Sequence, residues 1–383
     1  MLISIGIILI LSVLIGMIFE KINIPKIIAY ILIGVLLASK IDISLLNISP
    51  EIRKIALVII LIRAGLTLDF NVLKTMGKSS ILMCFLPATI EILGTAIFAP
   101  LIFKIPVIDA LILGSVIAAV SPAIVVPRMI GLINKGYSKI PQLILAGASM
   151  DDIFVITLFS IFMSIQKTGQ VTIKEIINLP LSIVLAVVVA VIFKYISIYL
   201  FKFIKEDTLR IILFFSLSLI ILEIEKYLPV ASLLSITLLA MLIKKENEEI
   251  GRVFIGSYEK LWKLFEIFLF VLIGANLKIS SVFDFGLLAL LLLIIAQVFR
   301  MFGVYLSLIG DKFKNREKIF AMVAYLPKAT VQAAIGVIPL ANNVPSGELI
   351  LTVAILSILF TAPLGAVFID NFYEKLLQKD NLS

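Results

Sequence analysis

The sequence contains no histidine and only one cysteine, Cys84, in 383 residues. The absence of histidine excludes a histidine base, a histidine metal ligand and a histidine pH switch. A single cysteine excludes an intramolecular disulfide, a cysteine-bound iron-sulfur cluster and a cysteine zinc site. Charged residues are also scarce, because they make up 15% of the chain where about 25% is usual in soluble domains. This composition excludes an ordinary cytosolic enzyme.

Hydrophobic residues make up 61% of the chain, against roughly 45 to 50% in soluble domains. A soluble domain of this size cannot bury so much apolar surface, so the solvent of this chain must be lipid. The formal net charge is +8, which resembles the charge of a nucleic-acid-binding protein. In a membrane chain, however, such an excess more often reflects basic cytoplasmic loops. We therefore expect an all-α integral membrane protein with a lipid bilayer, and no nucleic acid, as its partner.

Thirteen apolar runs are candidates for crossing about 30 Å of hydrocarbon, several of them with residues borrowed from their flanks. They are Leu2–Phe19, Ile27–Ala38, Ile55–Leu68, Ser80–Phe103, Ala110–Val126, Ile140–Met163, Leu181–Leu200, Ile211–Leu222, Leu228–Ile243, Leu264–Leu277, Phe285–Leu308, Ile319–Leu340 and Leu349–Ile369. Loops after odd-numbered runs, with the C-terminal tail, hold more than twice as many Lys and Arg residues as the other loops. This bias predicts a multi-pass protein of the cell (plasma) membrane with its N-terminus outside and its C-terminus in the cytoplasm.

A weak internal repeat relates the two halves of the chain. The segment from Ala64 to Asp69 resembles the segment from Ile273 to Lys278, at the ends of the third and tenth runs. The fifth and twelfth runs, also seven apart, both carry prolines near their middles. Since seven is odd, the two halves would enter the membrane in opposite directions. An inverted repeat with interrupted helices is typical of secondary transporters.

Several charged residues fall inside the runs, where each costs at least about 2.5 to 3.5 kcal/mol unless it has a partner, a water cavity or a function. They are Arg63, Lys194, Arg300, Lys328, Glu91, Asp151, Asp152 and Glu266. Arg300 stays protonated in any surroundings, so a carboxylate must accompany it, with Asp151 and Glu91 as the candidates. For Arg63, close helix packing through Ala64 and Gly65 is one explanation.

Adjacent Asp151 and Asp152 are the most informative of these charges. Neighbouring helical residues point about 100° apart, so the two carboxylates can face different partners. Either acid could be a purely structural partner of a basic group. The alternative is an ion and proton site, because a carboxylate removed from water can hold a proton or a small cation, but not both together. We favour this second interpretation, most strongly for Asp152.

Two runs carry helix breakers at mid-membrane. The fifth contains Ser121, Pro122 and Pro127, and the twelfth contains Pro327, Lys328, Thr330 and Gln332. Proline removes a donor and clashes with the preceding turn, which frees backbone carbonyls and half-helix ends, although a simple kink is an alternative for either run. We expect Lys328 to offset the negative end of a half-helix, while carbonyls near Ser121 help to coordinate a cation.

These features together resemble the monovalent cation/proton antiporters, and more narrowly their branch with an aspartate pair. The resemblance covers essentially the whole chain. It rests on the thirteen runs, Arg63-Ala64-Gly65-Leu66, Ser121-Pro122-Ala123, Asp151-Asp152, Arg300 and Leu326-Pro327-Lys328-Ala329-Thr330-Val331-Gln332-Ala333-Ala334.

The resemblance implies a homodimer of one membrane domain, 1–383, in which a core with two crossing broken helices moves like an elevator. Core helices would lie in about 53–165 and 260–369, and dimerisation helices in about 1–50 and 177–245. Asp152 matches the ion- and proton-binding aspartate of the family, and Asp151 matches its neighbour that pairs with a basic residue. Arg300 stands where many bacterial members have lysine. Because arginine cannot release a proton as lysine can, we expect electroneutral exchange.

The predicted function is thus exchange of Na⁺, or also Li⁺, for H⁺ at Asp152, which would serve pH homeostasis. It needs no cofactor and is not an enzyme activity. The chief alternative is K⁺/H⁺ exchange of the potassium-efflux type, followed by a passive cation channel. An intramembrane aspartyl protease is disfavoured, because its aspartates come from separate helices, usually with a Gly-x-Gly-Asp tract that this sequence lacks.

Overall fold

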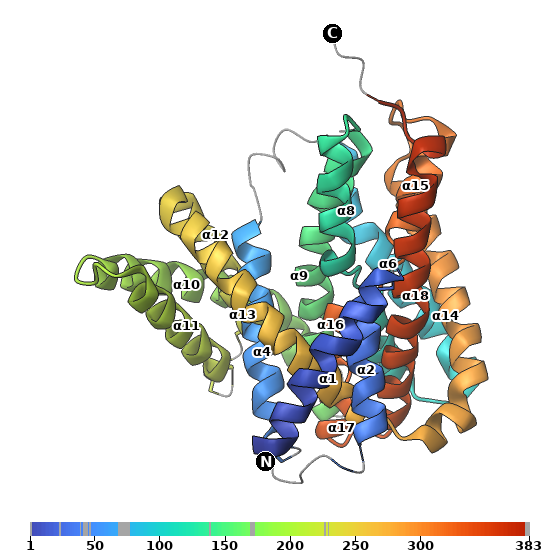
Figure 1. Cartoon of the computed structure of the whole chain (residues 1–383), viewed down its shortest axis with the longest axis horizontal. Coiled ribbons are helices and arrows are strands. Elements are labelled where there is room, and N and C mark those ends of the chain that lie inside the picture. The colour runs from blue at the N-terminus through green and yellow to red at the C-terminus, as the bar shows by residue number, and fades with distance from the viewer. Residues whose placement is uncertain are drawn as a thin grey trace. The chain divides into compact units, whose positions relative to one another are not determined.

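The computed structural model describes residues 2–22, 24–38, 40, 45, 47–67, 77–137, 139–168, 173–225, 227–228 and 230–379, which form helices and turns without a strand (Figure 1). The helices are α1 Leu2–Lys21, α2 Lys26–Leu37, α4 Ser49–Thr67, α6 Lys78–Phe103, α7 Val107–Ala118, α8 Pro122–Asn134, α9 Lys139–Thr168, α10 Ile173–Phe201, α11 Asp207–Ile224, α12 Ser232–Glu246, α13 Glu248–Ala275, α14 Ile279–Ser307, α15 Asn315–Ala324, α16 Thr330–Ile335, α17 Ile338–Ala341 and α18 Gly347–Leu376.

Each of the thirteen expected runs falls on one of these helices or, for the fifth and twelfth, on a broken series of them. Helices are the expected form, because a chain in hydrocarbon must satisfy every backbone N–H and C=O within itself. In the described part of the chain, seven helical segments are long and apolar enough to cross a membrane by length and composition. The remaining runs are shorter, more charged or interrupted.

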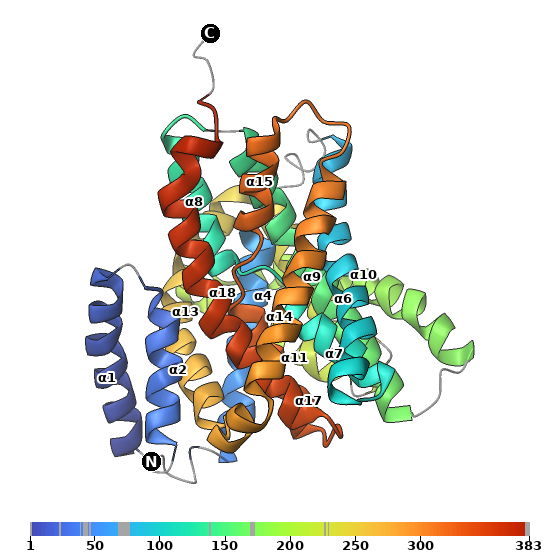
Figure 2. The ribbon, with the colours of Figure 1, turned by 90° about the vertical axis from the view of Figure 1, so that its right-hand side faces the viewer.

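Contacts divide the chain into two compact units. The first comprises Met1–Asn47, Phe70–Met163 and Phe270–Ser383. In it α14 packs along α6, α6 packs on α7, and α18 lies against α14, α15 and α7 (Figure 2). The second unit comprises Ile48–Asp69 and Ser164–Leu269, with α12 packed between α4 and α10. The division into core and dimerisation helices expected from the sequence stays a prediction.

The glycines of the weak repeat lie at close helix crossings. A Cβ on Gly65 of α4 would come 2.2 Å from the carbonyl oxygen of Thr237 on α12. A Cβ on Gly274 of α13 would come 2.2 Å from the carbonyl oxygen of Ile31 on α2. Neither crossing has room for a side chain, so small residues let the backbones meet, as in other membrane helix pairs. Packing therefore accounts for the glycine in both copies of the motif.

Two charged residues inside the second unit have partners. The guanidinium of Arg63 lies 5.6 Å from the ring centre of Trp262. Lys194 Nζ lies 2.5 Å from a carboxylate oxygen of Glu246. Both contacts compensate charge that a lipid environment would otherwise penalise. The ion pair between Lys194 and Glu246 was not predicted from the sequence.

Candidate functional site

Two interrupted helices meet inside the first unit. The chain leaves α7 at Ala118, runs extended through Ala119, and re-enters a helix at Pro122. It leaves α15 at Ala324 and re-enters a helix at Thr330. The backbone N–H of Ser121 donates to the carbonyl of Pro327 at 2.8 Å, so the two breaks are in contact. The fold therefore contains the two crossing broken helices that the sequence predicts.

The prolines explain where the breaks fall. Pro122 is the first residue of α8, a position where the missing N–H costs nothing and the fixed φ favours a helix start. Pro327 lies within the linker between α15 and α16. Pro127 was expected to contribute to the first break, but it lies inside α8, where the helix continues past it. One missing hydrogen bond is evidently tolerated there, and the break lies at 119–121 instead.

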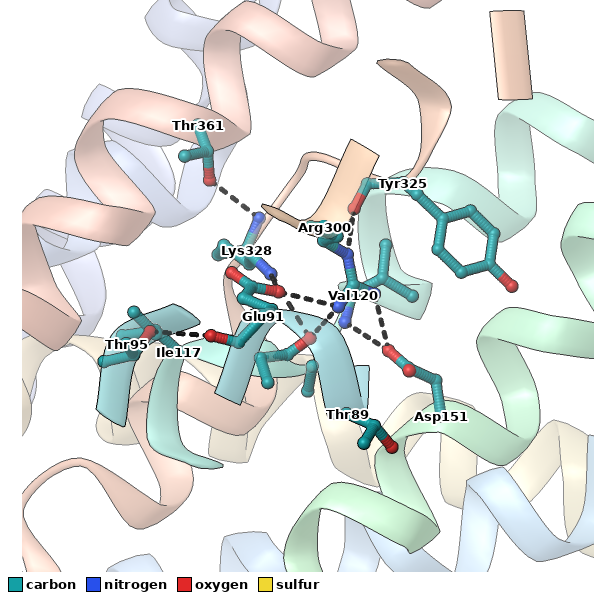
Figure 3. A network of polar contacts seen from close by, with 12 residues as sticks. Thr89, Glu91, Thr95, Ile117, Val120, Asp151, Arg300, Tyr325, Lys328 and Thr361 are labelled. Atoms are coloured by element: carbon teal, nitrogen blue, oxygen red, sulfur yellow. Dashed lines mark hydrogen bonds and ion pairs between the residues drawn. The ribbon is translucent and has the colours of Figure 1, made fainter. Parts of the chain in front are cut away.

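A fully buried arginine occupies the centre of the crossing (Figure 3). Arg300 of α14 donates from Nη1 to Glu91 Oε2 at 2.8 Å and from Nη2 to Asp151 Oδ2 at 2.7 Å. Its Nε donates to the Tyr325 carbonyl at 2.7 Å, and Nη1 also donates to the Ala118 carbonyl. The expected ion pair with Asp151 is present, and Glu91, the other candidate, is bound as well.

Lys328 is also fully buried, and the acid that it contacts is Glu91. Its Nζ donates to Glu91 Oε2 at 2.8 Å and to the Ala118 carbonyl at 3.3 Å. Ala118 is the last residue of α7, where the half-helix carries partial negative charge. Lys328 therefore lies at the negative half-helix end that the sequence predicts for it. Two cations, Arg300 and Lys328, face two acids, Glu91 and Asp151, so these four charges balance.

Asp152 is the carboxylate outside this balance. It is 4% exposed, and among the described residues it has no ion pair. Its Oδ1 has no hydrogen-bond partner. The neighbouring carboxylate is held differently, since Asp151 Oδ2 accepts from Arg300 and from the backbone N–H of Val120 at 2.8 Å. The adjacent acids therefore face different surroundings, as their spacing on one helix predicts.

Other buried oxygens at the crossing have no hydrogen-bond partner among the described residues. They are Glu91 Oε1, Ser121 Oγ, Asp151 Oδ1, Thr330 Oγ1 and Gln332 Oε1. Gln332 uses its amide nitrogen to bridge the two breaks, donating to the Ala119 carbonyl at 2.8 Å, which leaves its oxygen free. Buried polar groups are nearly always paired, so a set of unpaired acceptors here calls for an explanation such as a bound ion or water. Oxygen ligands of this kind suit a hard monovalent cation.

Helix α18 supports the second break. Thr361 Oγ1 accepts from the backbone N–H of Lys328 at 2.9 Å and donates to the carbonyl of Ser357 at 2.7 Å. One turn further along, a Cβ on Gly365 would come 2.3 Å from Pro327 Cγ. Thr361 was not predicted from the sequence, because a lone threonine in an apolar run has no distinguishing signal.

Gly365→Ala should therefore displace Pro327 and Lys328 and destabilise the protein by about 1 to 3 kcal/mol, the usual cost of overpacking. Heating the purified protein and following loss of the folded peak by size-exclusion chromatography measures this. Gly131→Ala on α8 is the matched control, because a Cβ there meets nothing within 4 Å. Equal stability of the two variants would show that Pro327 does not need the space at Gly365.

The family model described as "Sodium/hydrogen exchanger, transmembrane" matches residues 7–371. The chain belongs to this family. Members of the sodium/hydrogen exchanger family are transporters, so the chain is an integral multi-pass membrane protein and not an enzyme.

Curated relatives in the sodium/hydrogen exchanger family include two human proteins. The chain is 34% identical over 352 residues to "Sodium/hydrogen exchanger 9B2" of Homo sapiens, covering 86% of this chain and 65% of that protein. It is 32% identical over 356 residues to "Sodium/hydrogen exchanger 9B1" of Homo sapiens, covering 86% and 67%. The chain thus spans about two thirds of the length of these relatives. For Sodium/hydrogen exchanger 9B2 the share of its length, 65%, is just under two thirds.

A solved structure shares the fold. The sodium proton antiporter MjNhaP1 from Methanocaldococcus jannaschii, at pH 8, superposes with a TM-score of 0.82 at 19% identity, covering 97% of this chain and 96% of that one. The expected all-helical, multi-span antiporter fold is confirmed by this match.

Proposed function

We propose that the chain exchanges Na⁺ for H⁺ across a membrane and that Asp152 is the shared binding site of the two ions. The observation that carries the proposal is the buried carboxylate of Asp152 beside a charge network that is already balanced. A bare carboxylate is too costly to carry through a low-dielectric barrier, so it must first be neutralised.

Neutralisation can come from a proton or from a cation, and only one of them fits at a time. The unpaired oxygens of Ser121, Asp151, Thr330 and Gln332 are the candidate further ligands for Na⁺. If only the two neutralised states allow the core to move across, inward movement of one ion obliges outward movement of the other. Exchange then follows from competition, without covalent chemistry.

The network around Asp152 supports a one-for-one exchange. Arg300 keeps its proton in any surroundings, so it cannot serve as a second proton carrier. Lys328 stays bound to Glu91 and to the end of α7 in this arrangement. We therefore infer that one H⁺ moves for each Na⁺ and that the exchange is electroneutral. Glu91 acts as the acid that holds the two buried cations together.

The proposal extends to assembly and orientation. The relatives carry the name sodium/hydrogen exchanger, which favours Na⁺ over K⁺ as the cargo. We propose a homodimer in the cell membrane, with the N-terminus outside, in which the helices around the crossing move as an elevator. All the site residues named above belong to the first unit, which is consistent with their moving together.

Exchange is tested in proteoliposomes that contain a pH-sensitive dye. Na⁺, and also Li⁺, should dissipate a preformed proton gradient, K⁺ should not, and clamping the membrane potential should leave the rate unchanged. A response to K⁺ alone would replace the proposal by K⁺/H⁺ exchange, and uncoupled flux that does not saturate would indicate a channel. A transport current at zero imposed potential that reverses with the ion gradients would contradict one-for-one exchange.

A further inference from the structure

A cavity of about 750 Å³ lies at one end of the first unit, away from the crossing. It is the end at which α15 begins and α18 terminates (Figure 2). Residues from three parts of the chain line it: the start of α9, the connection from α14 to α15, and the residues after α18. Its basic side chains are Lys139, Lys312, Lys314 and Lys379, and we call this cavity the lysine pocket.

The lysine pocket has an excess of positive charge. Its four lysines face two acids, Asp311 and Glu317. The Glu317 carboxylate already accepts the backbone N–H of Lys314 at 2.8 Å, which caps α15. Within the part of the chain that the structure describes, Lys139, Lys312 and Lys314 take part in no ion pair, and all three are exposed. Three ammonium groups thus line one cavity without a carboxylate partner.

Apart from the charged residues and Gln378, the residues that line the pocket are largely apolar. Tyr137, Ile140 and Leu377 are buried, and the partly exposed Phe313 lies between Lys312 and Lys314. Helices α9 and α15 both begin here, and their N-terminal ends add partial positive charge. A ligand that fits must therefore bring negative charge against an apolar wall. Helices α9, α14 and α18 have ends at the pocket and are long and apolar enough to cross a membrane, so if they span the bilayer the pocket lies close to the lipid headgroups.

We propose that the lysine pocket binds the phosphate headgroup of an anionic membrane lipid. Basic pockets between helices at a membrane surface are known to attract such headgroups through their charge. The helices that meet here also lead to the crossing: α9 carries Asp152, α14 carries Arg300, and α15 precedes Lys328. A bound headgroup would hold the ends of these helices together and so stabilise the first unit.

The test compares two triple variants of the full chain, purified in neutral detergent. Lys139→Gln/Lys312→Gln/Lys314→Gln removes the unpaired lysines of the pocket. Lys202→Gln/Lys205→Gln/Lys260→Gln removes the same charge from exposed positions in the second unit. The midpoint of heat unfolding is measured with phosphatidylglycerol or with phosphatidylcholine. A lipid that binds only the folded state raises this midpoint.

Phosphatidylglycerol should raise the midpoint by several degrees in the wild type and in the second-unit variant. The pocket variant should lose at least half of that rise. With phosphatidylcholine, the midpoints of all three proteins should respond alike. Equal rises in the two variants would overturn the proposal. Glycerol phosphate in solution should give no rise, and a rise equal to that with the lipid would overturn the lipid as the source of the anion. No transport is measured, so the result is independent of the function proposed for Asp152.

Discussion

Asp152→Asn is expected to reduce Na⁺-driven proton flux to the level of empty liposomes while the protein stays folded. The substitution keeps the shape of the side chain but removes the charge that a proton or Na⁺ neutralises. The site would be permanently neutral, so it could neither bind Na⁺ by charge nor release a proton. Asp152 has no ion pair among the described residues, so its neutralisation leaves no cation unpaired.

Dye-reported flux in proteoliposomes measures the loss of transport in Asp152→Asn, and the heat-unfolding midpoint shows whether this variant stays folded. Asp284→Asn is the matched control, because it makes the same chemical change at an exposed position near the start of α14. The control should transport at the wild-type rate. Wild-type flux in Asp152→Asn would remove Asp152 from the mechanism.

Arg300→Ala is expected to destabilise the protein by about 3 to 5 kcal/mol, the usual cost of removing one partner from a buried ion pair. Arg300 is the partner of both Glu91 and Asp151, and it also satisfies the Ala118 and Tyr325 carbonyls. Without it the Val120 N–H is the one donor left to Asp151 among the described residues, and the charge of Asp151 is uncompensated in the interior. Transport should fail for the same reason.

A double-mutant cycle separates the charge from the packing. Asp151→Asn in the Arg300→Ala background removes the uncompensated acid and should recover part of the lost stability. Arg300→Lys keeps the charge but cannot contact Glu91 and Asp151 in the fork geometry of a guanidinium, so its loss should be intermediate. Heat-unfolding midpoints of the wild type, Arg300→Ala, Asp151→Asn and the double variant measure the coupling. Additive losses would show that Arg300 and Asp151 do not depend on each other.

Some partners of the buried charges could be predicted from the sequence. Arg300 had to meet a carboxylate, and only a few acids lie within the apolar runs, so Asp151 and Glu91 could be named. Adjacent Asp151 and Asp152 could face different partners on one helix, and their surroundings do differ. Such reasoning works because an isolated charge in lipid is costly enough to limit the choices.

The remaining contacts depend on where distant backbone atoms meet. The Ala118 carbonyl accepts from both Arg300 and Lys328, and nothing about an alanine in an apolar run indicates this. Lys328 Nζ contacts Glu91, and this choice of acid depends on the crossing geometry. From the sequence, Pro127 is as good a candidate for a helix break as Pro122, but of the two Pro122 begins α8 and Pro127 lies inside it. Proline content locates an interruption only to within a few residues.

The packing of the crossing also explains why small and apolar residues surround it. Gly365 admits the Pro327 ring, and Thr361 satisfies the Lys328 backbone N–H that the break leaves without a helical partner. The two residues lie four apart on one face of α18. The architecture that holds the charges therefore depends on residues whose side chains carry no charge.

Competition between Na⁺ and H⁺ for one carboxylate is tested most directly by counting protons released when Na⁺ binds. Purified protein in weak buffer with a pH dye is titrated with Na⁺, and binding is followed in parallel by calorimetry. At a pH where the site is largely protonated, about one proton should leave for each Na⁺ bound, and Asp152→Asn should release none. Na⁺ binding without proton release, or release unchanged in Asp152→Asn, would contradict the account.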